Sequence, residues 1–355
     1  MVVSRLFWEV LGYPRELGDW LTQLLERHNR ADALRVHALV IYGQVLMHQG
    51  DLTQARDIAD QSLQLSRALS NKQAEAFSLW GLGAVNMWQG DIGQGTPILE
   101  QSLALYQLLG DKFGQAVATG WLCMNHNDLE RPKAYLIESL RLHRELRHLS
   151  GIAGCLNELA RLAIWESDFS SPIAWLEEAQ AIYHQLGDEA QEAAVLENYG
   201  NMAFWMADYE QACVYHQQAI VLNEKGNIYN TPWFHADLAY ARLRQGNIAK
   251  AKERFEFCIG EFQRGNNVGG LVFTIEGLAS LNVQQERVEH AAQLYAWADA
   301  MRKKMGDSRP PVEQASVGRD LEIIHSKLND SEFAQLTAEG QRLTIEKVVA
   351  LALEV

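Results

Sequence analysis

A short phrase built around an acidic or amide residue recurs along this chain at intervals close to forty residues. It reads HQGDLTQA at 48–55, WQGDIGQG at 88–95, MADYEQA at 206–212 and RQGNIAKA at 244–251. Aligned on this residue, which we call the anchor, seven copies fall into register. A period of this length indicates a repeat array, so a solenoid is expected. The anchors are Asp51, Asp91, Asp128, Asp168, Asp208, Asn247 and Arg287.

Small residues recur eight positions before the anchor and four and eleven positions after it, apart from Pro132 and Pro172 at the second of these offsets. Small side chains let two helix backbones approach, so each copy is predicted to be a helix A before the anchor and a helix B after it. Gly50 and Gly90 suit the left-handed turn that ends helix A. The anchor aspartate is expected to cap helix B. A Gly83→Leu substitution is expected to overpack the contact between helices A and B.

Two copies depart from this pattern. The third copy is three residues short near the start of its helix A, which predicts a local irregularity. In the fourth copy, Ser171 and Pro172 read as an N-cap followed by the first helical residue, so helix B should begin about a turn late. Arg287, the anchor of the last copy, is expected to be a weak cap.

The net charge of −14 argues against direct binding to nucleic acid or to anionic membranes, because the sequence has no cluster of Lys and Arg. No apolar run is long enough to span a bilayer, and the first twenty residues do not resemble a signal peptide. We therefore expect a cytoplasmic protein. The four cysteines are spread singly and are expected to be reduced core thiols: Cys123, Cys155, Cys213 and Cys258.

A search for catalytic patterns favours a protein that is not an enzyme. The sequence contains no HExxH, no GxSxG and no phosphate loop of the form GxxxxGK[ST]. The close set His126, Asp128 and Glu130 is interpreted as a capped turn. No cofactor and no metal are expected.

The spacing of small residues and anchor resembles the tetratricopeptide repeat, lengthened from its usual 34 residues to about 40. With the opening LFWEVLGYPRELGDWLTQLL and the closing FAQLTAEGQRLTIEKVVALALE, the chain resembles the sensor region of bacterial LuxR- and AfsR-type signalling ATPases, distant relatives of the maltotriose-responsive activators. Thr337 departs from that family, which often has Trp there. The resemblance implies an all-α, right-handed superhelical solenoid with a helical flank at 1–30, seven repeats at 31–307 and a helical cap at 308–355.

By the same resemblance, positions eleven, seven, four and three before the anchor line or edge the concave groove. The first two rows mix aromatic with polar side chains, as a ligand site requires. Arg161 could pair with Glu197 or hold a ligand carboxylate or phosphate, and the tryptophans could equally pack between repeats. The expected groove residues are Trp80, Trp121, Asn125, Asn157, Arg161, Trp165, Glu197, Asn201, Trp205 and Tyr240.

Two functions follow from this sequence. The first is a sensor that binds a protein, a peptide or a small-molecule inducer and controls ATPase and DNA-binding domains of a longer polypeptide or of a partner. The alternative is a stand-alone adaptor or peptide receptor, which would use the same groove without an attached switch.

Overall fold

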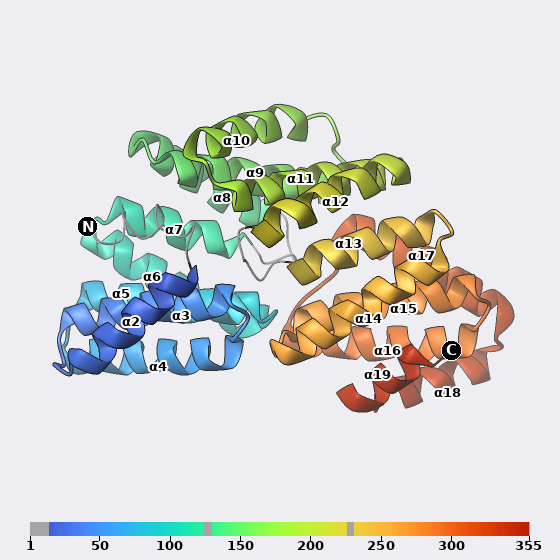
Figure 1. Ribbon diagram of the computed structural model, residues 1–355. Coiled ribbons are helices and arrows are strands. Elements are labelled where there is room, and N and C mark those ends of the chain that lie inside the picture. The colour runs from blue at the N-terminus through green and yellow to red at the C-terminus, as the bar shows by residue number, and fades with distance from the viewer. Residues whose placement is uncertain (1–13, 124–129, 226–230, 355) are drawn as a thin grey trace.

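The computed structural model describes residues 14–123, 130–225 and 231–354, which form helices and contain no strand (Figure 1). The predicted all-α solenoid of helix pairs is confirmed. Before the array lies α2 (Pro14–Arg27). Copies one to four comprise α3 (Ala33–His48), α4 (Leu52–Ala68), α5 (Lys72–Trp88), α6 (Ile92–Leu109), α7 (Lys112–Leu122), α8 (Glu130–Glu145), α9 (Leu149–Trp165) and α10 (Pro172–Leu186). Copies five to seven comprise α11 (Glu189–Trp205), α12 (Tyr209–Lys225), α13 (Thr231–Arg244), α14 (Ile248–Arg264), α15 (Val268–Gln284) and α16 (Val288–Met305). After them come α17 (Pro311–Lys327), α18 (Asp330–Gly340) and α19 (Ile345–Leu353).

The turn from helix A to helix B has one geometry in every described copy. The anchor N–H donates to the carbonyl five residues earlier, as Asp51 does to Leu46 at 3.0 Å, and the residue before the anchor is left-handed. Gly50 and Gly90 both have φ +82°, as predicted. Non-glycine residues take this conformation in other copies, at Ser167, Ala207 and Glu286.

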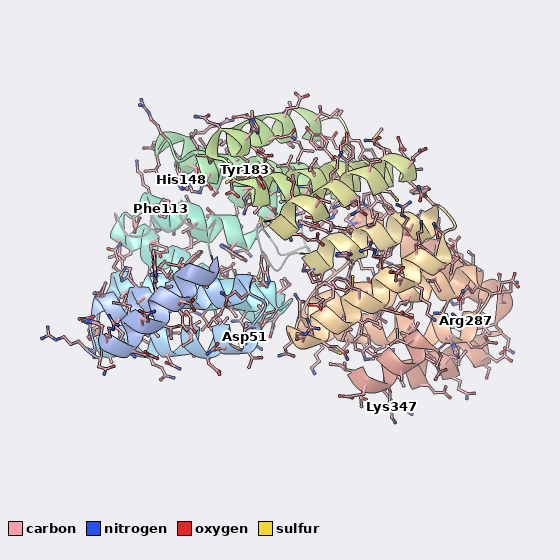
Figure 2. All side chains as sticks on the ribbon, in the orientation of Figure 1. Asp51, Phe113, His148, Tyr183, Arg287 and Lys347 are labelled. Carbon is pink, nitrogen blue, oxygen red and sulfur yellow. The ribbon has the colours of Figure 1, made fainter. Side chains whose placement is uncertain are left out.

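Side-chain capping follows the chemistry of the anchor. Asp51, Asp91 and Asp208 each accept a hydrogen bond from the backbone N–H three residues later, which confirms the predicted caps. Asn247 and Arg287 make no such bond, as expected for Arg287. Figure 2 labels Asp51 and Arg287, which occupy equivalent turns at the two ends of the array. Asp128 lies outside the described residues.

The small residues lie where helices A and B cross. A Cβ atom added to Gly83 on α5 would lie 2.6 Å from Leu99 Cγ on α6. One added to Gly95 would lie 2.6 Å from Met87 Sδ. Eleven residues after the anchor, the Ser102 hydroxyl donates to the carbonyl of Ala76 across the same helix pair. Bulk at these positions would separate the two helices.

The two irregular copies differ from their neighbours as the sequence suggests. Helix α7 begins 16 residues before its anchor, whereas α9 begins 19 before Asp168. In copy four, helix B begins at Pro172 with Ser171 before it. The Ser171 side chain makes no cap, however. The Asp168 carboxylate instead accepts from the N–H groups of Ser170 and Ser171, so the anchor still closes the turn.

Helices α17 to α19 pack on the last copy. The side chains of Ile324 on α17 and Val348 on α19 are fully buried and join the apolar cluster formed by α13 to α16. Helix α18 packs against α16, where Gly340 lies close to the backbone of Gln293. No helix in the described part of the chain is long and apolar enough to cross a membrane.

Candidate functional site

The concave face is identified by α17, which packs against both α9 and α15 although these two helices A belong to copies four and seven. Helix α17 therefore lies on the side where the helices A face one another. The Ser316 hydroxyl on α17 accepts a 2.7 Å hydrogen bond from Arg244 at the end of α13. Helices α9, α11 and α13 supply most of the expected groove residues, so the candidate site is the concave face of copies four to six.

On α9, the Arg161 guanidinium binds Glu158 of its own helix, with 2.9 Å between Nε and the carboxylate. It also stacks over the Trp165 ring, 4.1 Å from the ring centroid. Of the two open interpretations of Arg161, the ion pair with Glu197 is not found. Arg161 retains about a fifth of its side-chain surface, with relative exposure 20%. It is thus held in place by both contacts.

Asn157, also on α9, is joined to the next helix A. The Asn198 amide on α11 donates to the Asn157 side-chain carbonyl at 2.8 Å and to its backbone carbonyl at 3.1 Å. Both asparagines are nearly buried, with 6% and 3% exposure. Asn157 therefore holds two copies together, and Asn198, which the sequence reasoning missed, is its partner.

Glu197 on α11 faces Asp237 on α13, and their carboxyl groups hydrogen-bond each other. Burial, and then the facing Asp237 carboxyl, raise the pKa of Glu197 well above its ordinary value. Burial likewise raises the pKa of Asp237. Both carboxyls keep part of their surface exposed, yet enough protein surrounds them for burial to be the main cause. Both pKa values are therefore shifted in the direction that favours the protonated, uncharged form.

Aromatic side chains flank this polar set. Tyr240 on α13 donates its hydroxyl to the Phe273 carbonyl at 2.9 Å, and Trp205 on α11 packs edge-on against Phe204. Both keep partial exposure, as does Asn201 on α11.

Two further tryptophans lie in the first copies of the array. Trp121 packs against Trp88 between copies two and three. Trp80 is 1% exposed and stacks on Phe77, so it belongs to the core and the expectation of an exposed groove side chain was wrong there. Asn125 lies outside the described residues.

The residues missed by sequence reasoning share one repeat position. Glu158, Asn198 and Asp237 all lie ten residues before their anchors, where the other copies have Ile41, Gly81, Ala118 and Gly277. A polar side chain in copies four to six, in a row that is otherwise apolar or small, was a signal available in the sequence. It marks the same three copies in which the groove carries paired polar groups.

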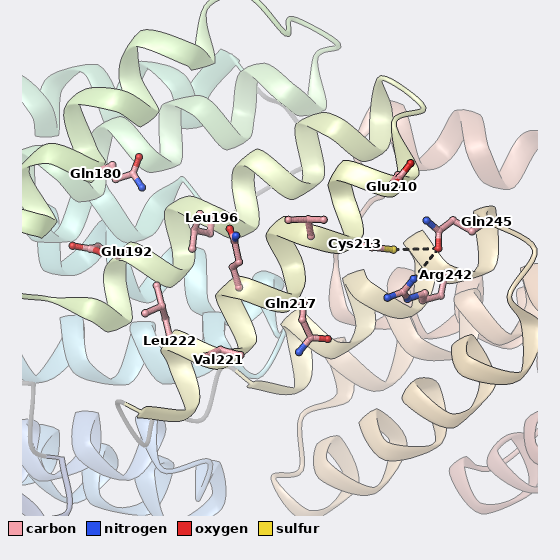
Figure 3. Close-up of a pocket in the computed structure, with 12 residues that line it drawn as sticks. Gln180, Glu192, Leu196, Glu210, Cys213, Gln217, Val221, Leu222, Arg242 and Gln245 are labelled. Atoms are coloured by element: carbon pink, nitrogen blue, oxygen red, sulfur yellow. Dashed lines mark hydrogen bonds between the residues drawn. The ribbon is translucent and has the colours of Figure 1, made fainter.

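A second hollow, of about 880 Å³, lies over the exposed face of α12 (Figure 3). Cys213 and Arg242 contact Gln245 there, and Val214 and Val221 are exposed. None of the ten expected groove residues lines it. The lining residues are Gln180, Glu192, Leu196, Glu210, Cys213, Val214, Gln217, Gln218, Val221, Leu222, Arg242 and Gln245.

Two thiols and the arrangement of possible metal ligands complete the description of the concave face. Cys123 and Cys155 lie beside the polar set, and burial raises the pKa of both thiols, to about 11 for Cys155. A thiol with so high a pKa is a poor nucleophile. Within the described residues, no group of three or more His, Cys, Asp and Glu side chains is placed to hold a metal ion.

Comparisons with known proteins show the fold. No protein-family model matches the chain, and no curated protein matches it. Among solved structures, a Rap protein complexed with competence and sporulation factor is similar over 96% of this chain and 99% of that one, with TM-score 0.62 and 14% identity. The structure of NprR in complex with its cognate peptide NprX is similar over 73% of this chain and 82% of NprR, with TM-score 0.55 and 14% identity. Aspartyl phosphate phosphatase F from Bacillus subtilis covers 95% of both chains, with TM-score 0.53 and 12% identity. The LuxR- and AfsR-type specifics of the resemblance stay a prediction.

Proposed function

We propose that this chain is a non-enzymatic module that binds a protein or peptide along the concave face of copies four to six. The observation that carries the proposal is the row of polar pairs on adjacent helices A. Arg161 with Glu158 forms a charged pair, Glu197 with Asp237 a pair of carboxyl groups, and the Trp165 ring stacks on Arg161. Such groups can bind the amides and charged side chains of an extended polypeptide, while Trp165 and Trp205 supply apolar area.

The wider role we propose is sensing within a signalling protein, in which occupancy of the groove controls attached or partner ATPase and DNA-binding domains. The stand-alone peptide receptor draws support from the NprR structure, which has a similar fold and holds a peptide. An immunoblot of source cells separates the two roles. A native polypeptide well above 40.0 kDa favours the attached sensor, and one of 40.0 kDa favours the receptor.

The site is tested by selecting binders from a library of random peptides and measuring their affinity for variants. Asn201→Ala and Glu197→Gln should weaken binding about tenfold or more while the thermal unfolding temperature changes little, because both side chains are partly exposed. Asn157→Ala should lower stability as well, since it removes the acceptor of Asn198.

Gln217→Ala, in the hollow over α12, is the matched control and should leave affinity unchanged. Binding that survives the concave-face variants but is lost in Gln217→Ala would move the site to α12. If no peptide binds the native chain above background, peptide recognition by this face is wrong.

A further inference from the structure

Two turns that lie far apart in the sequence touch in the fold. Gly90 ends the turn after α5, and Gly269 lies in the first turn of α15. A Cβ atom added to Gly90 would lie 2.9 Å from Gly269 Cα, and one added to Gly269 would lie 3.3 Å from Gly90 Cα. The Asn267 side-chain amide donates to the Trp88 carbonyl at 3.4 Å across the same contact. Copy two therefore meets copy seven backbone to backbone.

A second pair of glycines extends this contact. Gly93, at the start of α6, lies against the end of α16. A Cβ atom added to Gly306 would lie 3.3 Å from Gly93 Cα, and one added to Gly93 would lie 3.3 Å from the Met305 carbonyl oxygen. In Figure 1, the lower ends of α5 and α6 and the near end of the α14–α15 pair meet at the centre of the lower edge.

The repeat itself does not require Gly93 or Gly269, whereas Gly90 and Gly306 also take the left-handed conformation at the ends of their helices. Two residues after the anchor, the other six copies have Thr53, Glu130, Ser170, Glu210, Ala249 and Glu289, and only copy two has glycine. Gly93 and Gly269 both lie in the first turn of a helix with ordinary negative φ, a conformation that does not call for glycine. The close approach of the two ends of the array gives a physical reason for both.

Contact between copies two and seven closes the solenoid into a ring. In a repeat array, each copy is rotated slightly relative to the previous one. The distance between two distant copies therefore depends on the rotation at every copy between them. A backbone contact at van der Waals distance is lost after a small change in any of them. Helix α17 spans the concave face from α15 to α9, so the ring is also braced from inside.

We propose that Gly90, Gly93, Gly269 and Gly306 form a latch that holds the array closed. The closed ring admits a flexible chain to the concave face, whereas a folded partner reaches that face only when the latch opens. The latch is independent of any particular partner, and only its effect on access rests on the proposed use of the concave face.

The latch is tested first by a distance measurement that needs no ligand. Nitroxide labels on Gln54→Cys and Lys304→Cys, both exposed and on either side of the contact, report the separation of the ends by pulsed electron resonance. The native cysteines are buried and leave the new thiols to react. Gly269→Leu should replace one narrow distance by a longer, broader distribution. Gly260→Leu, on the exposed face of α14 with no atom near its Cβ position, is the matched control and should keep the native distance.

A milder pair covers the case in which Gly269→Leu fails to fold. Asn267→Asp keeps the acceptor that caps α15 through Gly270 N–H but removes the amide that donates to Trp88. Asn71→Asp makes the same change at the cap of α5. The first should broaden the distance distribution and the second should not. If both Gly269→Leu and Asn267→Asp retain the native distance in folded protein, there is no latch.

Access is measured with a thiol at Asn201→Cys. The reaction rate with N-ethylmaleimide should be the same in the latched chain and in Gly269→Leu. The rate with biotin-maleimide already bound to streptavidin, a folded probe, should rise at least tenfold in Gly269→Leu. Equal rates with the folded probe would overturn control of access, even if the distance measurement supports the latch and whether or not a peptide partner is found.

Discussion

In the first two copies, the buried apolar side chains fall into several separate clusters, whereas one large cluster runs from part of α13 to α19. Leu21 and Val45 belong to one small cluster, Met47 and Val85 to a second, and Leu63 to a third. By contrast, a single cluster joins residues from Ala236 to Ala352. The same repeat thus yields a segmented core at one end and a continuous core at the other. Helices α17 and α19 contribute Val317, Ile324, Val348 and Ala352 to the larger cluster.

Charge is distributed differently as well. In copy three, Arg141 pairs with Glu138 on the surface, where the side chains are 57% and 48% exposed. In copy seven, Arg302 binds Glu276 with 2.7 Å between Nε and the carboxylate, and these side chains are 10% and 4% exposed. Arg302 also binds Asp307, and Arg309 binds the same Glu276. The C-terminal unit, α13 to α19, therefore combines a continuous core with buried ion pairs. It should unfold as one unit, while earlier copies open more locally.

Removal of 308–355 should have the largest effect, because we propose that this segment caps the array. Without α17 to α19, the buried side chains of Ile324 and Val348 are lost and the cluster beneath them is exposed to water. We expect aggregation, measured as loss of the monomer peak in size-exclusion chromatography. Removal of 1–27 takes away α2, which packs on the small cluster around Leu21, and should leave soluble, helical protein. A soluble monomer from the C-terminal truncation would contradict the cap.

Arg302→Met should have the next largest effect. It should lower the free energy of unfolding by about 3–5 kcal/mol, because the buried Glu276 carboxylate loses this partner. Arg141→Met breaks exposed pairs and should leave the free energy of unfolding almost unchanged. The measurement is the free energy of unfolding in urea for both variants. Similar losses would show that burial does not distinguish the two regions.

The sequence predicts the local parts of this fold and misses the long-range ones. The stop at Gly50, the cap at Asp51 and the close crossing at Gly83 were found because each depends on residues within one helix pair. The partner of Glu197 was not found, because it depends on which face of α13 turns toward α11. The contact between Gly90 and Gly269 depends on the rotations of all the copies between them, and no short stretch of sequence specifies their total.

Acid should destabilise copies three to five before the C-terminal unit. Burial lowers the pKa of His143 and of His216 to about 3, well below the ordinary 6.5, while His235 on α13 falls to about 4. The unfolded chain therefore binds more protons, so the stability from these neutral histidines is full above pH 6.5 and falls as the pH drops toward 3. At pH 5, the preference of the unfolded chain for protonated His216 should by itself lower the free energy of unfolding by about 2 kcal/mol.

Replacing His216 tests this directly. His216→Leu should flatten the dependence of the unfolding free energy on pH between pH 7 and pH 5, because a fully buried group no longer takes up a proton on unfolding. His184→Leu, at a side chain 86% exposed, is the control for replacing a histidine by leucine at the surface. Hydrogen exchange at pH 5 should show copies three to five opening before α15 to α19. Simultaneous opening would mean that the core is not segmented in the way the clusters suggest.

The smallest expected effect compares one turn in the two regions. Ala207 and Glu286 both precede an anchor with φ near +60°, at 64° and 61°. The left-handed conformation is about 1–2 kcal/mol unfavourable for a residue with a Cβ. Glycine removes this cost, but it loses more chain entropy on folding, which offsets part of the gain. Ala207→Gly and Glu286→Gly should therefore each stabilise the folded protein by about 1 kcal/mol.

Amide hydrogen exchange will show where in the array the stability is gained. Ala207→Gly should protect α11 and α12 and their immediate neighbours, whereas Glu286→Gly should slow exchange from α13 to α19 together, because that unit opens as a whole. If the two patterns are equally wide, the turns are coupled along the entire array, and the distinction between a segmented and a continuous core does not describe how this protein unfolds.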